Sequence, residues 1–131
     1  RAIDAALASA NLNTTDVGMI VAHGNGTANS DVSEARALER MFGNTMPPVT
    51  GFKWAFGHLL AASGLIETVV TIAAQRARVV PGMATLGELD PACGRLNVSR
   101  EARAPRSDVA LLLARGFGGS NVACLLRVAT S

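Results

Sequence analysis

Short apolar segments alternate with helical segments along this 131-residue chain, and that alternation limits the folds available to it. Apolar residues recur at helical spacing in residues 1–12, 30–42 and 58–79. Short apolar runs typical of strands lie near Val17–Ala22, Pro48–Gly51, Leu96–Val98, Asp108–Ala114 and Val122–Val128. This order predicts an α/β layered domain in which helices pack on a mixed sheet.

Composition agrees with one folded domain and excludes several functions. Hydrophobic residues make up 49% of the chain and charged residues 17%, which argues against disorder. The net charge of +2 is too small to indicate nucleic-acid binding, and two cysteines are too few for a disulfide framework. The apolar run Val69–Ala74, which Thr71 interrupts, is far too short to span a membrane. We expect a cytoplasmic domain covering residues 1–131, without linkers, nucleic-acid binding or membrane binding.

The chain opens inside an expected helix at Arg1, and no signal sequence precedes that helix. We therefore also expect that the sequence is a piece of a longer protein, cut within an ordered region. The helix at 30–42 would be capped by Ser30 or Asp31, and Asp31 and Glu34 would compensate its dipole from the solvent side.

The longest expected helix, residues 58–79, is rich in small residues that permit close packing. Helical spacing predicts a buried side formed by Leu59, Ala62, Ser63, Ile66, Val70, Ala73, Ala74 and Ala77. The opposite, more polar edge would contain Thr68, Thr71, Gln75 and Arg78.

The two histidines and the single lysine are the main candidates for chemistry. His23 follows an expected buried strand and precedes a glycine-punctuated loop, a position where ligands bind in open α/β sheets. His58 is expected to begin the long helix, where the helix dipole and nearby Lys53 disfavour the charged ring. A neutral imidazole can donate a hydrogen bond to a developing oxyanion. Each histidine could instead have a purely structural role, as a loop residue or at a helix start.

Two further features complete the set of candidates. Residues 116–121 form a glycine loop between two expected strands, which excludes a dinucleotide fingerprint. The loop is either a tight turn or a set of backbone N–H donors with Phe117 as an apolar shutter. Glu67 is either exposed or the partner of a buried Lys53. Cys93 and Cys124 lack an activating environment, and Cys124 is expected in the core.

Several of these residues fall into recognisable motifs. Residues 23–27 read His-Gly-Asn-Gly-Thr and are followed by Asp31 and Glu34. Residues 53–58 contain Lys-x-x-x-Gly-His and are followed by a small-residue helix that carries Glu67.

Two more motifs follow in order. Residues 90–93 read Asp-Pro-Ala-Cys and precede an Ala-Arg pair at 102–103, and residues 115–121 read Arg-Gly-Phe-Gly-Gly-Ser-Asn. Together the four motifs resemble the C-terminal half of the β-ketoacyl-acyl-carrier-protein synthases, condensing enzymes of the thiolase fold. The resemblance runs from residue 2 to 128 and implies the C-terminal half of that layered α-β-α-β-α fold.

The resemblance implies a decarboxylative condensation of malonyl carrier protein with an acyl group held on a cysteine of the other half. His23 and His58 would stabilise the enolate, and Lys53, paired with Glu67, would tune and orient His58. Thr27 and position 25 would contact the phosphopantetheine arm. The backbone of the loop at Phe117 and Gly118 would complete an oxyanion hole, and Phe117 would gate the acyl pocket. No resident cofactor or metal is implied, because the acyl carrier protein carries the substrate.

The sequence also departs from the family pattern. Asn25 stands where the family has threonine, Ser30 replaces glycine, and Arg115 replaces the first phenylalanine of the glycine loop. Leu113 and Ala114 replace a small polar pair, which disfavours a cation site seen in some members.

Three interpretations remain open. The first is that the parent protein is an active synthase. The second is that the parent is a non-catalytic partner subunit such as a chain-length factor. The third is that the chain is a stable fragment with no activity of its own. Because the nucleophilic cysteine belongs to the other half, the isolated chain is expected to be inactive. The expected partners are acyl carrier protein, the N-terminal half of the fold, and a second subunit in a homodimer or heterodimer.

Overall fold

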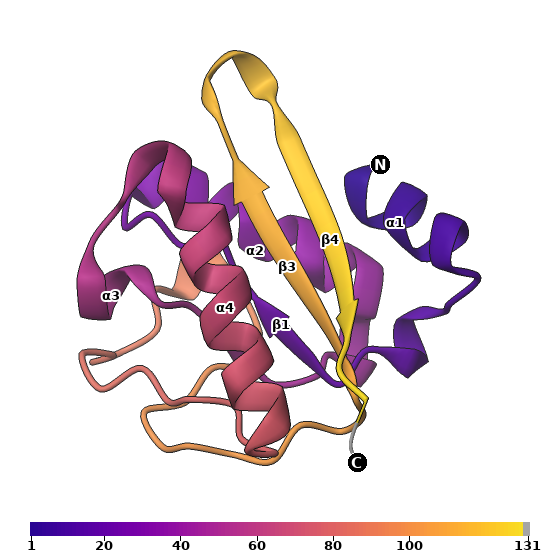
Figure 1. Cartoon of the computed structure of the whole chain (residues 1–131). Coiled ribbons are helices and arrows are strands. Elements are labelled where there is room, and N and C mark those ends of the chain that lie inside the picture. Colours follow the sequence, from indigo (N-terminus) through magenta and orange to yellow (C-terminus); the bar gives the residue numbers. More distant parts are fainter. Residues whose placement is uncertain (130–131) are drawn as a thin grey trace.

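The computed structural model describes residues 1–129 and shows one mixed sheet between two layers of helices (Figure 1). The sheet order is β2-β1-β3-β4, and β1 runs parallel to both β2 and β3, whereas β3 and β4 form an antiparallel hairpin. The four strands are β1 (Met19–Val21), β2 (Val49–Thr50), β3 (Val109–Arg115) and β4 (Asn121–Arg127). The predicted mixed sheet is therefore confirmed.

Four α-helices surround this sheet, and the three longer ones form its two outer layers. They are α1 (Ala2–Ala10), α2 (Ala28–Phe42), α3 (Lys53–Phe56) and α4 (Ser63–Arg76). Helices α1 and α2 pack on one face, where Leu38 and Leu7 meet Ile20 and Leu111 of the strands. Helix α4 covers the opposite face (Figure 1). Strand β3 contributes side chains to the core on both faces of the sheet, because its side chains alternate between the two faces.

Two elements differ from the sequence-based expectation. Residues 96–98 form no strand, although the carbonyl of Asn97 accepts a hydrogen bond of 2.9 Å from the backbone N–H of Val49. Helix α2 begins at Ala28 with Thr27 as its N-cap, so Ser30 and Asp31 lie inside the helix and do not cap it. The glycine-punctuated loop before α2 is thus shorter than predicted.

Helix α4 starts later than expected, and the side of the helix that packs on the sheet is not the predicted one. It begins at Ser63 rather than His58, because Gly57 and Leu60 have left-handed backbone angles, φ +77° and +52°, that interrupt helical hydrogen bonding. The predicted buried side is wrong apart from Ser63 and Ala74, which are buried, and Val70, which is partly buried against the core. The residues of α4 that are buried are Ser63, Glu67, Thr71, Ala74 and Gln75. The helix therefore packs against the sheet mainly through its polar side.

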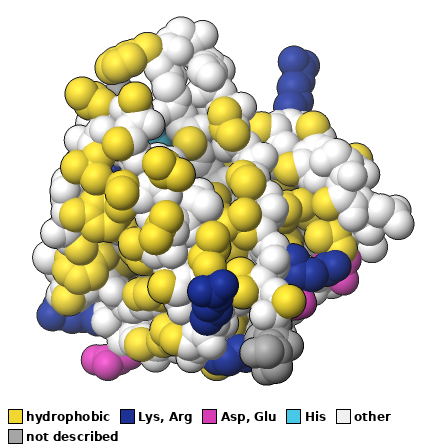
Figure 2. Space-filling model, viewed as in Figure 1, with side chains coloured by type: hydrophobic (Ala, Val, Ile, Leu, Met, Phe, Trp, Pro, Cys, Tyr) yellow, Lys and Arg dark blue, Asp and Glu magenta, His cyan; other side chains and the backbone are white. Residues whose placement is uncertain are grey.

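The apolar side of α4 faces outward. Leu65 is 68% exposed and Val69 is 56% exposed, and Leu60 just before the helix is 75% exposed. Figure 2 shows hydrophobic side chains gathered over the area that α4 occupies in Figure 1. A contiguous apolar surface of this kind is typical of a face that another protein layer covers.

A tight contact beside β1 gives a first stability prediction. A Cβ atom at Gly18 would overlap the backbone nitrogen and oxygen of Ser107, whereas a Cβ atom at Gly87 would meet open space. We expect Gly18→Ala to lower the free energy of unfolding by about 1–3 kcal/mol through overpacking. Gly87→Ala is the matched control and should change the urea midpoint little. Equal midpoints for the two variants would contradict this packing.

Candidate functional site

His23 lies at the carboxyl end of β1, where three parts of the chain converge. Its side chain is buried, with 4% of its surface exposed. The ring nitrogen Nδ1 accepts a hydrogen bond of 3.3 Å from the backbone N–H of Arg115 at the end of β3. The His23 carbonyl accepts a hydrogen bond of 2.6 Å from the Lys53 ammonium. The end of β3 therefore holds the ring of this residue, and Lys53 at the start of α3 holds its backbone.

Lys53 and Glu67 form a buried ion pair. The Lys53 Nζ lies 2.5 Å from the Glu67 Oε1, and the two side chains are 5% and 3% exposed. The choice left open for Glu67 is thus settled in favour of a buried partner. Lys53 does not hydrogen-bond the His58 ring among the described residues, since its donors reach Glu67 and the His23 carbonyl. The lysine therefore links α4 to the His23 loop.

Glu34 holds the same loop from α2, and the expectation that it faces solvent is wrong. It is 6% exposed, and its two carboxylate oxygens accept hydrogen bonds from the backbone N–H groups of His23 (2.8 Å) and Gly24 (3.0 Å). Burial raises the pKa of Glu34, and the two N–H donors oppose that shift. Sequence reasoning missed this role because an acidic residue near a helix start has an ordinary explanation as a dipole partner.

His58 lies five residues before α4, so the helix-dipole argument for its protonation state fails. Its ring is exposed, and Nδ1 accepts a hydrogen bond of 3.0 Å from the backbone N–H of Leu60. The Ser63 hydroxyl lies 3.5 Å from the same nitrogen. This local turn, rather than the helix terminus, orients the ring.

The two histidine rings form a pair of similar donors. Their centroids are 5.5 Å apart and their planes meet at 79°. In each ring Nδ1 accepts a backbone N–H, so Nδ1 carries no proton and a neutral ring has its proton on Nε2. Two Nε2–H groups of neighbouring neutral rings can donate to one oxyanion without placing a permanent charge beside it.

The surroundings of His23 favour the neutral ring. Burial, followed by the positive charges of Lys53, His58 and Arg115, lowers its pKa from 6.5 to about 4. At neutral pH the ring is therefore almost entirely uncharged, as hydrogen-bond donation to an anion without proton transfer requires.

This pKa can be checked directly. We expect the His23 ring resonances to titrate with a midpoint near pH 4 in a nuclear magnetic resonance experiment. Because the unfolded chain takes up this proton near pH 6.5, the His23 contribution should make the fold less stable as the pH falls from 6.5 to 4. A midpoint near 6.5 would show that the ring is neither desolvated nor close to positive charge.

Three of the expected substrate-binding residues, Thr27, Phe117 and Gly118, are exposed, and Asn25 is half-buried. The Thr27 backbone N–H and hydroxyl both donate to the Asn25 side-chain oxygen, at 3.0 and 2.8 Å. Phe117 is fully exposed, and Gly118 beside it has a left-handed backbone with φ +70°. The loop contacts the histidines through the backbone of Arg115, so the shutter function expected of Phe117 stays a prediction.

The two cysteines differ from each other. Cys93 is buried and burial raises the pKa of its thiol, which disfavours a nucleophilic role. Cys124 is exposed, so its expected place in the core is wrong. Within residues 1–129 there is no cluster of three His, Cys, Asp or Glu side chains suited to a metal, and no helix with the length and apolar character needed to cross a membrane.

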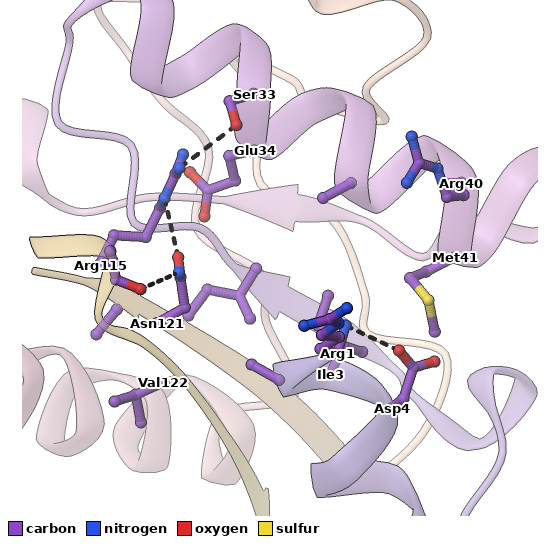
Figure 3. A pocket seen from close by; sticks show the side chains of 15 residues that line it. Arg1, Ile3, Asp4, Ser33, Glu34, Arg40, Met41, Arg115, Asn121 and Val122 are labelled. Carbon is purple, nitrogen blue, oxygen red and sulfur yellow. Dashed lines mark hydrogen bonds and ion pairs between the residues drawn. The ribbon is translucent and has the colours of Figure 1, made fainter.

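A cavity of about 950 Å³ lies between α1, α2 and the β3–β4 hairpin. Figure 3 shows Arg115 pointing toward Ser33 and Asn121 at this cavity, with Glu34 nearby. The cavity therefore lies next to the two chain segments that hold His23.

The chain is similar to known condensing enzymes. Residues 1–86 match the model of the β-ketoacyl synthase C-terminal domain. The chain is 39% identical to a polyketide β-ketoacyl synthase from Streptomyces cyaneus over 96% of its own length and 30% of the relative's. It is 41% identical to 3-oxoacyl-[acyl-carrier-protein] synthase 2 of Synechocystis sp., covering 93% of this chain and 30% of that protein. The chain thus spans about a third of the length of these relatives.

Solved structures agree with the sequence comparison. A β-ketoacyl synthase from Burkholderia phymatum superposes with a TM-score of 0.89 and 33% identity, covering 94% of this chain and 30% of the other. A type II polyketide ketosynthase, solved in complex with its acyl carrier protein, gives a TM-score of 0.89 and 29% identity over 97% of this chain and 32% of that one. The thiolase-like α/β fold implied by the motifs is confirmed.

Proposed function

The chain belongs to the β-ketoacyl synthase family, and we propose that it is the C-terminal part of an enzyme that condenses malonyl carrier protein with an enzyme-bound acyl group. The observation that carries this proposal is the pair of histidine rings, 5.5 Å apart, each with Nδ1 occupied by a backbone N–H. Such a pair suits an enolate oxygen.

The proposed reaction uses these donors in one step. The bond between the malonyl α-carbon and its carboxylate breaks, carbon dioxide leaves, and the electron pair becomes an enolate on the thioester. The Nε2–H groups of His23 and His58 donate to the enolate oxygen. The α-carbon then attacks the acyl thioester on the nucleophilic cysteine of the N-terminal half, and the thiolate leaves. His23 and His58 are the catalytic residues of this step, and Lys53, Glu67 and Glu34 position His23.

The substrate would reach this site on the phosphopantetheine arm of acyl carrier protein, with no resident cofactor. Asn25 and Thr27, which lie two and four residues after His23, are proposed to contact that arm, and the Phe117–Gly118 loop is proposed to border the acyl group. One solved relative is a ketosynthase in complex with its carrier protein, which supports this choice of partner. The domain is proposed to extend over residues 1–131.

Release of carbon dioxide from malonyl carrier protein by the whole protein tests the proposal. The sequence upstream of Arg1 supplies an independent test, because the active enzyme needs a cysteine at a strand-to-helix elbow. A glutamine or another residue at that elbow would favour the alternative, a non-catalytic chain-length-factor subunit. Two solved relatives are ketosynthases paired with such a factor, and the departures at Asn25 and Arg115 leave room for this alternative.

The exposed side of α4 predicts the behaviour of the chain on its own. We propose that the N-terminal half of the synthase covers Leu60, Leu65 and Val69. The isolated 131-residue chain should therefore self-associate in sedimentation velocity, and the double change Leu65→Lys/Val69→Glu should reduce that association. Ala5→Glu/Ala8→Lys on the exposed side of α1 is a matched control with the same added charges. A monomeric wild-type chain would count against a covered α4 face.

A further inference from the structure

The Arg115 side chain connects the end of β3 with the start of α2 and the start of β4. Its Nη1 donates to the Ser30 carbonyl (2.8 Å) and lies 3.4 Å from the Ser30 hydroxyl, and its Nη2 reaches the Ser33 hydroxyl (3.4 Å). Both serines belong to the start of α2. Its Nε donates to the Asn121 side-chain oxygen (3.2 Å) at the start of β4. The three donor groups of one rigid guanidinium thus point at two different elements (Figure 3).

The contact with Asn121 reaches into the glycine loop. The Asn121 side-chain nitrogen donates to the Gly119 carbonyl at 2.8 Å, and the Gly116 backbone N–H donates to the Ser120 carbonyl at 2.8 Å. The base of the loop is therefore tied at both ends, whereas Gly118 and Gly119 at its tip have left-handed backbones and no neighbour that would meet a side chain.

The placement of this arginine needs a specific explanation. A cation beside the first turn of a helix opposes the helix dipole, at a cost of about 0.3–1 kcal/mol. No carboxylate lies within salt-bridge distance of Arg115 in the described part of the chain, and the nearby Glu34 is engaged by the His23 and Gly24 backbone. Its position is maintained instead by neutral oxygens of Ser30, Ser33 and Asn121.

The backbone of the same residue holds the catalytic ring. The Arg115 N–H donates to Nδ1 of His23, so any shift of the end of β3 relative to α2 also shifts the donor that fixes the His23 ring. Glu34 of α2 fixes the His23 backbone at the same time. The guanidinium joins these two supports.

We propose that Arg115 is a positioning residue, whose side chain fastens the β3–β4 loop to the start of α2 and thereby keeps the His23 ring in the orientation that presents Nε2–H. The catalytic consequence rests on the proposed function, because it requires His23 to stabilise the enolate. The fastening itself is a property of the loop and can be measured separately.

The test uses Arg115→Gln and Arg115→Lys in the whole protein that carries this chain. We expect Arg115→Gln to speed amide hydrogen exchange of Gly116, whose N–H donates to the Ser120 carbonyl, by about tenfold, the change that loss of one charge-assisted hydrogen bond produces. The nitrogen resonances of the His23 ring should also show a mixture of the two neutral tautomers. Lysine keeps the charge but lacks the planar fork, so it should restore the loop only in part. Arg127→Gln, at the other end of the same hairpin, is the charge-matched control.

Activity provides the second readout. Arg115→Gln should lower kcat for carbon dioxide release while the KM for malonyl carrier protein stays unchanged. Unchanged loop exchange together with unchanged His23 signals would overturn the proposal, and so would a raised KM with an undisturbed loop, which would identify Arg115 as a carrier-protein contact. If the wild-type protein releases no carbon dioxide, the proposed function fails, and the exchange and tautomer measurements still decide the role of Arg115.

Discussion

Replacing either histidine by alanine in the whole synthase is expected to lower the rate of carbon dioxide release from malonyl carrier protein by about 10²–10³-fold, the usual cost of one oxyanion donor. Each ring presents one Nε2–H because its Nδ1 is occupied by a backbone N–H, from Arg115 for His23 and from Leu60 for His58. In the double variant the rate should fall by less than the product of the two single fold-decreases, since both donors bind one oxygen.

The controls separate chemistry from folding. His58 is exposed, so His58→Ala should leave the free energy of unfolding almost unchanged while removing activity. Arg127→Gln should leave both quantities unchanged, because Arg127 is exposed and pairs with Asp108 only at 3.7 Å. Full decarboxylation by both histidine variants would show that the enolate assignment is wrong, whatever the role of the rest of the chain.

The second large effect concerns the Lys53–Glu67 pair. Lys53→Met leaves the Glu67 carboxylate buried without its cation, and we expect the free energy of unfolding to fall by about 3–5 kcal/mol. Glu67→Leu should have a similar effect because it leaves the ammonium without its anion. The double variant Lys53→Met/Glu67→Leu should recover most of the stability, since no charge then remains buried.

Urea unfolding at two protein concentrations, followed by circular dichroism, measures these differences and separates them from association. Asp108→Asn, which breaks the exposed pair with Arg127, is the comparison and should cost less than about 1 kcal/mol. Although the double variant is stable, it should remain poorly active, because the hydrogen bond from Lys53 to the His23 carbonyl is lost. Additive losses in the double variant would contradict a coupled buried pair.

The sheet could be predicted from sequence because its signals are local. The β-branched run before His23 and the two apolar runs around the glycine loop are strands, and the loop joins them as expected. The Lys53–Glu67 pair could also be predicted, since a lysine that is buried in an apolar chain needs an anion as its partner.

The orientation of α4 could not be predicted in the same way. Helical spacing reveals a polar and an apolar side, and the usual inference places the apolar side on the sheet. Here Glu67 and Thr71 face the sheet, where Lys53 and the Glu67 carbonyl satisfy them, and Leu65 and Val69 face outward. The rule fails here because the polar side chains satisfy one another where they are buried, which helical spacing does not reveal. The role of Glu34 could not be predicted either, because its partners are backbone N–H groups, which every residue except proline has.

The pairing of β1 with β3 has a consequence for how this site comes into being. Met19 to Val21 align with Ala110 to Leu112, so the centre of the sheet joins residues from opposite ends of the chain. Closing so long a segment slows folding, because its entropic cost precedes any contact. During synthesis His23 emerges 92 residues before Arg115, so its ring can be fixed only after the end of β3 has formed. A chain truncated before β3 would therefore have both histidines but no donor for the His23 ring.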